Sequence, residues 1–259
     1  MSEIWSLLSQ SPTQFKGGAI WTVIKDINGA LSATGLALLV LFFAMGVMKS
    51  TIDIAQLKRP EQAVKFFIRF ILAKFAVTNS LQIITTIFEI CQGVVSHTMS
   101  AVSSLGASAV SIPAEIVKKI EDVGFFESIP LWAVTLLGSL FVTVLSFVMI
   151  LSIYGRFFRI FTYAALAPVP LSTFAGESTT SIGVHFLKSF AGVCLEGAVV
   201  VIACLIYSAF ASSNPVTLKD GISAVNMVWA YVGETIFGML VLVGSVKASD
   251  RVIKELMGI

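Results

Sequence analysis

Charged side chains are scarce in this chain. Only 12% of its 259 residues are Asp, Glu, Lys or Arg, whereas 56% are hydrophobic. Soluble domains carry about 25% charged residues, so a water-soluble globule of this size would lack the polar surface that it needs. The deficit excludes a soluble cytosolic enzyme. It favours a multi-pass membrane protein, because one crossing helix needs about 20 mostly apolar residues.

Residues that carry out catalysis or hold metals are equally scarce. The two histidines, His97 and His185, belong to no HExxH or HxE pattern. The three cysteines, Cys91, Cys194 and Cys204, lie in apolar runs and form no CxxC pair. A glycine-rich phosphate loop is absent, and the net charge of only +2 gives no strong field for nucleic acid. We therefore predict a non-enzymatic protein with no catalytic residue, metal site or cofactor.

Uncharged stretches divide the chain into about five predicted transmembrane helices. They lie at residues 27–48, 70–91, 128–155, 188–210 and 222–246. The predicted fold class is all-α, a polytopic membrane helix bundle in one transmembrane domain, residues 27–259. Its last part, 247–259, is predicted to form a short cytoplasmic helix. Residues 1–26 are rich in aromatic side chains and are expected to form an external, interfacial amphipathic segment.

The lysines and arginines indicate the orientation of these helices. Cytoplasmic loops of membrane proteins carry an excess of Lys and Arg. Twelve of these residues fall on the side assigned to the cytoplasm and five on the other side. The N-terminus is therefore predicted outside and the C-terminus inside. Residues 93–114 are long enough for a further crossing, but this would place Arg156 and Arg159 outside, so we assign the segment to the exterior.

Two acidic residues fall near the middle of predicted spans, Glu196 in the fourth and Glu234 in the fifth. A charge at the bilayer centre costs about 2.5–3.5 kcal/mol on insertion scales, so each carboxyl must face protein or water, or stay protonated. One interpretation is interhelical pairing: a hydrogen bond to a serine, Asn226 or Tyr231, or an ion pair of Glu196 with Lys188. The other interpretation is the lining of an aqueous path.

Four basic residues are candidates for a role at the cytoplasmic face. Lys65 and Arg69 are four residues apart on one predicted helix face, and Arg156 and Arg159 follow the third predicted span. These side chains either fix the topology by reaching the inner headgroups or dock a cytosolic partner.

Pro168 and Pro170 predict a helix break within residues 164–171. Each proline lacks an amide N–H and fixes φ, so a continuous helix cannot pass through this segment. The break is either a turn at the cytoplasmic interface or a loop packed into the core of an oligomer, because non-helical backbone near a membrane needs cover from protein or water.

Several segments resemble one known family. They read RFFR at 156–159, YAALAPVPLSTFAGE at 163–177, FLKSFAGVCLEG at 186–197, LKRPE at 57–61 and FIRFILAK at 67–74. They are similar to the TrbL-like polytopic inner-membrane proteins of conjugation and type IV secretion, in particular those of Gram-positive conjugative elements. The resemblance covers about residues 30–250 and is specific in the stretch 156–197.

The resemblance implies a non-enzymatic channel or platform subunit of the cytoplasmic membrane. Such a subunit forms a homo-oligomeric ring, a pentamer, and contacts an external stalk or pilus subunit and internal scaffold proteins and ATPases. It helps single-stranded DNA and protein to cross the bilayer. The family has no fixed catalytic residues, so none is assigned here.

Two other functions remain open at this stage. One is a membrane subunit of a small-solute transporter of the ATP-binding-cassette permease type, although no convincing coupling-helix motif is present. A carrier would show paired broken helices in two halves, whereas this sequence has one proline break. The other is a purely structural assembly protein.

Overall fold

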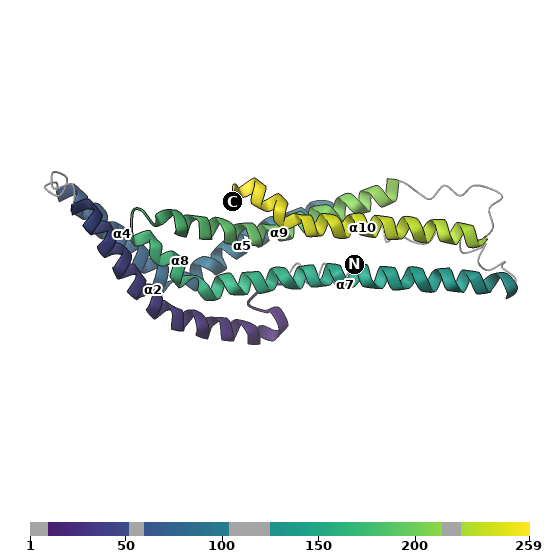
Figure 1. The fold of residues 1–259 in the computed structure, drawn as a ribbon, viewed down its shortest axis with the longest axis horizontal. Helices are drawn as coiled ribbons and strands as arrows, with labels where there is room; N and C mark the ends of the chain where they lie inside the picture. The colour runs from purple at the N-terminus through teal and green to yellow at the C-terminus, as the bar shows by residue number, and fades with distance from the viewer. Residues whose placement is uncertain (1–9, 52–59, 104–124, 214–223) are drawn as a thin grey trace. The chain divides into compact units, whose positions relative to one another are not determined.

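The computed structural model describes residues 10–51, 60–103, 125–213 and 224–259. The elements in these residues are all helical (Figure 1): η1 (Phe15–Gly18), α2 (Ala19–Thr51), α4 (Pro60–Thr78), α5 (Ser80–Ser103), α7 (Phe125–Leu166), α8 (Pro168–Leu171), η2 (Ser172–Ala175), α9 (Thr180–Ser213) and α10 (Ala224–Met257). The predicted all-α fold class is confirmed.

Four of these helices are long and apolar enough to cross a membrane: Ala19–Lys49, Ile129–Leu166, Thr180–Phe210 and Val225–Met257. Helices α4 and α5 pass the same test only together, as a pair bent by 76°. The total of four spans, or five with the bent pair, agrees with the predicted polytopic bundle. Of the segment 93–114, residues up to Ser103 belong to α5 and the rest lie outside the described residues.

Polar side chains at the bend between α4 and α5 bond to the backbone of α4. Asn79 donates from Nδ2 to the carbonyl of Phe75 at 3.0 Å, and Thr78 donates from Oγ1 to the carbonyl of Lys74 at 3.0 Å. Such side-chain bonds compete with the helical ladder and often accompany bends. Sequence alone predicts one span at 70–91, whereas the structure divides this stretch at Asn79.

Helix α2 begins before the predicted first span. It starts at Ala19, so residues 19–26, which the sequence places in the interfacial segment 1–26, belong to the same helix as the span. The preceding Gly17 and Gly18 have φ of 74° and 77°, a conformation that glycine adopts readily and other residues rarely. Residues 1–9 lie outside the described part of the chain.

Helix α7 continues beyond the predicted end of the third span. It passes Arg156 and Arg159 and ends at Leu166. A charged residue limits an apolar window, but it keeps its backbone N–H and C=O and so does not end a helix. Pro168, which lacks the N–H, begins a separate turn instead. The tail 247–259 is likewise not a separate helix. Its charged residues do not end α10, which runs through most of this segment to Met257.

The described chain forms two compact units, and the first comprises residues up to 94, 155–197 and 250–259. Within it, α2 and α4 lie side by side and α8 and η2 pack against both (Figure 1). Asn28 on α2 donates to the carbonyl of Ala164 at 2.7 Å and accepts a hydrogen bond from Ser80 at 3.1 Å. This buried amide links α2 to α7 and α5.

The second unit comprises residues 95–154 and 198–249. Its described core joins α7 to α10 through Leu131, Met227 and Val228. Gly138 on α7 allows close packing, because a Cβ there would lie 2.5 Å from a methyl group of Val232. Small residues at helix contacts are typical of membrane bundles, where backbones approach closely.

Candidate functional site

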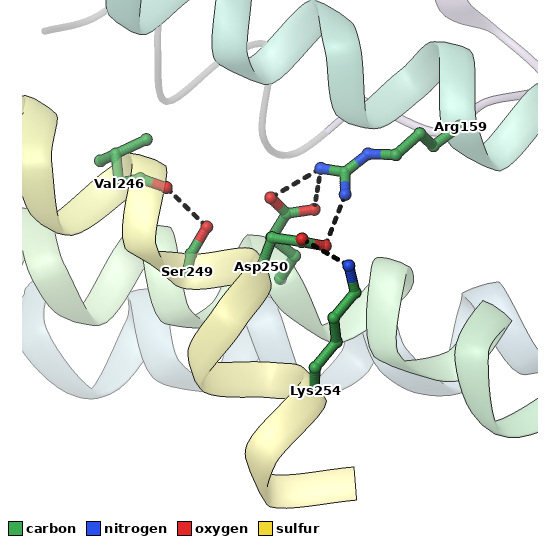
Figure 2. Close-up of polar contacts among 6 residues, drawn as sticks. Arg159, Val246, Ser249, Asp250 and Lys254 are labelled. Atoms are coloured by element: carbon green, nitrogen blue, oxygen red, sulfur yellow. Dashed lines mark hydrogen bonds and ion pairs between the residues drawn. The ribbon is translucent and has the colours of Figure 1, made fainter. Parts of the chain in front are cut away.

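A cluster of charged side chains lies in the first unit, on α7, α9 and α10. Arg159 donates from Nη2 to both carboxylate oxygens of Glu196, at 2.6 and 2.8 Å, and from Nη1 to Asp250 at 2.7 Å. Lys254 donates to the other oxygen of Asp250 at 2.8 Å. Figure 2 shows Arg159 opposite Asp250, with Lys254 one turn further along α10. The cluster thus balances two cations against two anions.

The members of this cluster differ in burial. The Glu196 side chain is only 9% exposed, whereas Arg159 and Asp250 are 38% and 36% exposed. A carboxylate removed from water must be paired, because an uncompensated buried charge is strongly destabilising. Arg159 is therefore the residue that allows Glu196 to be charged inside α9, and Asp250 extends the same network to α10.

Arg156 lies one turn before Arg159 on α7 and has a different environment. It is 2% exposed, and its Nε, Nη1 and Nη2 have no hydrogen-bond partner among the described residues. Its guanidinium packs on the backbone of Gly197, where an added Cβ would lie 2.6 Å from Cζ. Its electrostatic partners include Glu196 and the sulfurs of Cys194 and Cys91. This side chain is therefore buried inside the bundle and is not available at the surface for docking.

A cavity of about 120 Å³ adjoins the charge cluster. Its polar lining includes Arg159, Tyr163, Ser189, Asp250 and Lys254. A polar cavity of this size holds several water molecules. The more exposed side of the cluster is therefore hydrated, while Glu196 itself is largely withdrawn from water.

Glu234 has the opposite environment to Glu196. It lies in the part of α10 that belongs to the second unit and is exposed. It makes no ion pair or hydrogen bond with the residues that the structure describes. The neighbouring Phe237 and Leu240 are 60% and 51% exposed. An unpaired carboxyl on an otherwise apolar helix face needs water or another polar chain.

The remaining predicted residues lie apart from the charge cluster. Lys65 is exposed on α4, and Arg69 pairs with Glu177 at 3.4 Å. Pro168 is buried at the start of α8, while Pro170 is partly buried within it.

Arg159 is a partner of Glu196 that the sequence did not suggest. Lys188, the predicted ion-pair partner, is exposed. Sequence reasoning missed this pairing because it placed Arg159 beyond the end of the third span. It also missed Asp250 and Lys254, although their spacing of four residues on a helix is a recognisable ion-pair signal.

These observations define a polytopic helical membrane protein with an ion-pair network around one buried carboxylate. Residues 1–168 match the family described as TrbL/VirB6 plasmid conjugal transfer like protein. The match covers more than half of the chain, which therefore belongs to this family. No curated protein and no solved structure matches the chain significantly.

Family membership makes the chain a membrane subunit of a conjugal transfer machine that works with other subunits. The matched residues include only the first part of the stretch 156–197, in which the sequence resemblance is most specific. Glu196, Glu234 and Asp250 lie outside the match, so their roles depend on their physical environment alone.

Proposed function

We propose that the chain is a non-enzymatic channel or platform subunit of the cytoplasmic membrane that helps single-stranded DNA and protein to cross it. Several copies surround the path as a homo-oligomeric ring, with the N-terminus of each outside and the C-terminus in the cytoplasm. Membership of the conjugal transfer family supports this proposal, together with four or five apolar helices in the described chain.

The exposed Glu234 is the single structural observation that supports a path between copies. A carboxylate in hydrocarbon costs about 2.5–3.5 kcal/mol, and within the described chain this one has no polar partner. Glu234 is exposed on α10 in the second unit. Water that solvates it therefore lies outside the described core of the copy, and in this proposal that water belongs to a path between copies.

The two membrane carboxyls thus receive different roles in this proposal. Glu196 is paired with Arg159 and is a structural tie between α7 and α9. Glu234 faces the aqueous path. Among the basic residues, Lys65 and Arg69 both lie on α4, outside the charge cluster. In this proposal they lie at the membrane surface, where they orient the chain or contact a cytosolic subunit.

Replacing Glu234 with Gln is expected to lower conjugal transfer by about tenfold, equivalent to about 1.4 kcal/mol, while membrane insertion and assembly stay intact. The amide keeps the shape of the side chain and removes the charge that holds water in the path. The measurement counts recipient cells that acquire the element, with a donor lacking the chain as the floor of the assay.

Glu255→Gln is the matched control for this variant. Glu255 lies on the same helix and pairs with Arg251 at the exposed surface, so the transfer frequency of this variant should equal that of the unmodified chain. Normal transfer by Glu234→Gln would contradict a lining role. Normal transfer by the donor that lacks the chain would contradict the proposed function itself and favour the solute-transporter alternative.

A further inference from the structure

Two cysteine thiols meet between α5 and α9 in the first unit. Cys91 on α5 donates a hydrogen bond from Sγ to the carbonyl of Ala191 at 3.9 Å. Cys194 lies three residues further along α9, on the same helix face, and its thiol is a direct neighbour of that of Cys91. Both cysteines are free thiols and are only 6% and 1% exposed.

The guanidinium of Arg156 interacts with both sulfurs. This buried side chain comes from a third helix, α7, and makes no hydrogen bond with the described residues. The site therefore brings together two adjacent thiols and one buried guanidinium, contributed by three helices.

We propose that Cys91 and Cys194 are an oxidation-sensitive pair that forms a reversible disulfide between α5 and α9. The sulfur–sulfur bond forms as two S–H bonds break. Both electrons and both protons pass to a membrane-permeant two-electron acceptor, such as a quinone or a diazene, which is reduced to the quinol or the hydrazine. An added dithiol reverses the reaction by exchange.

The disulfide changes how the first unit is held together. In the reduced protein, α5 and α9 are joined at this point by the weak hydrogen bond from Cys91 to Ala191, whereas in the oxidised protein they are joined covalently. Separation of the two helices at this level is then blocked. The inference depends on contacts within one chain, so it stands or falls independently of the proposed transfer function.

A thiol count on the full chain in lipid particles tests the proposal. The protein is treated with diamide, quenched with acid, denatured, labelled with a maleimide and weighed by mass spectrometry. The chain has three cysteines, so the expected count falls from three labels to one. Treatment with dithiothreitol before labelling should restore all three.

Cys204 provides the matched control. It is also buried, but it lies in the second unit and is not part of the thiol contact. The Cys204→Ala variant starts with two of the three thiols, and its count should fall to none. The Cys91→Ala variant also starts with two, and its count should stay at two, because Cys194 then has lost its partner.

Three outcomes would overturn the proposal. The first is an unchanged thiol count after oxidation of protein whose circular dichroism shows it to be folded. The second is loss of thiols accompanied by a covalent dimer on a non-reducing gel, which would place the bond between copies. The third is a gain of oxygen mass on the cysteines, which would indicate sulfinic or sulfonic acid instead of a disulfide.

Discussion

Replacing Arg159 with Met should lower the free energy of unfolding by about 2–4 kcal/mol, between the values for exposed and for buried ion pairs. The variant keeps an unbranched apolar stem but removes the two hydrogen bonds, of 2.6 and 2.8 Å, from Arg159 to Glu196. Because the Glu196 side chain is 9% exposed, water replaces these bonds poorly. Reversible unfolding of the purified chain in bicelles would measure the change.

A matched control exists in the same unit. Arg69 and Glu177 form an ion pair at 3.4 Å with exposed fractions of 41% and 70%, so Arg69→Met should change the stability by less than about 1 kcal/mol. Adding Glu196→Gln to Arg159→Met should recover part of the loss, because the neutral amide no longer requires a counter-charge. If Arg159→Met and Arg69→Met lower the free energy of unfolding equally, the loss of Arg159 does not leave an uncompensated charge at Glu196.

The fold class was accessible from sequence because hydrophobicity determines it directly. Chain segments that are uncharged over about 20 residues form helices in a membrane, since no other structure satisfies their backbone groups within one segment. Helix α4 begins at Pro60, a residue type that favours the first position of a helix. The bend at Asn79 was not predicted, because it lies within an apolar stretch and involves local bonds of Thr78 and Asn79.

The charge cluster was harder to predict because its residues lie far apart in the sequence. Arg159, Glu196 and Asp250 come from three helices, and only packing brings them together. Arg156 and Arg159 were predicted to follow the third span, so their place within helix α7 was not predicted. Gly197 carries no distinctive signal in the sequence, because small residues are common in membrane helices, whereas the structure shows that it makes room for Arg156.

Glu196 and Glu234 show the limit of interpretation by residue type. Both are single carboxyls within apolar helices, and sequence gives them the same two alternatives. The structure separates them by burial and pairing, since Glu196 is buried and bonded to Arg159, whereas Glu234 is exposed. This difference depends on tertiary packing, which brings Arg159 of α7 to Glu196, and a single helix sequence does not specify it.

Gly35→Ala is expected to destabilise the protein by about 1–3 kcal/mol, the range for overpacking a tight contact. A Cβ at Gly35 on α2 would lie 2.7 Å from the carbonyl oxygen of Pro168 and 3.0 Å from its carbonyl carbon. Both are backbone atoms, so no side-chain rotation relieves the overlap. Pro168 itself is buried, as is Leu171 at the other end of α8, so α2 and α8 must move apart.

Gly29→Ala on the same helix isolates the steric effect from helix propensity. A Cβ at Gly29 meets nothing within 4 Å, and alanine favours a helix over glycine by about 0.5–1 kcal/mol. This control should therefore be as stable as the unmodified chain or slightly more stable, while Gly35→Ala unfolds at lower denaturant. Both variants are compared by the same bicelle unfolding assay. If the two alanines behave alike, α2 does not pack closely on Pro168, and the proline turn is held by its own helix end alone.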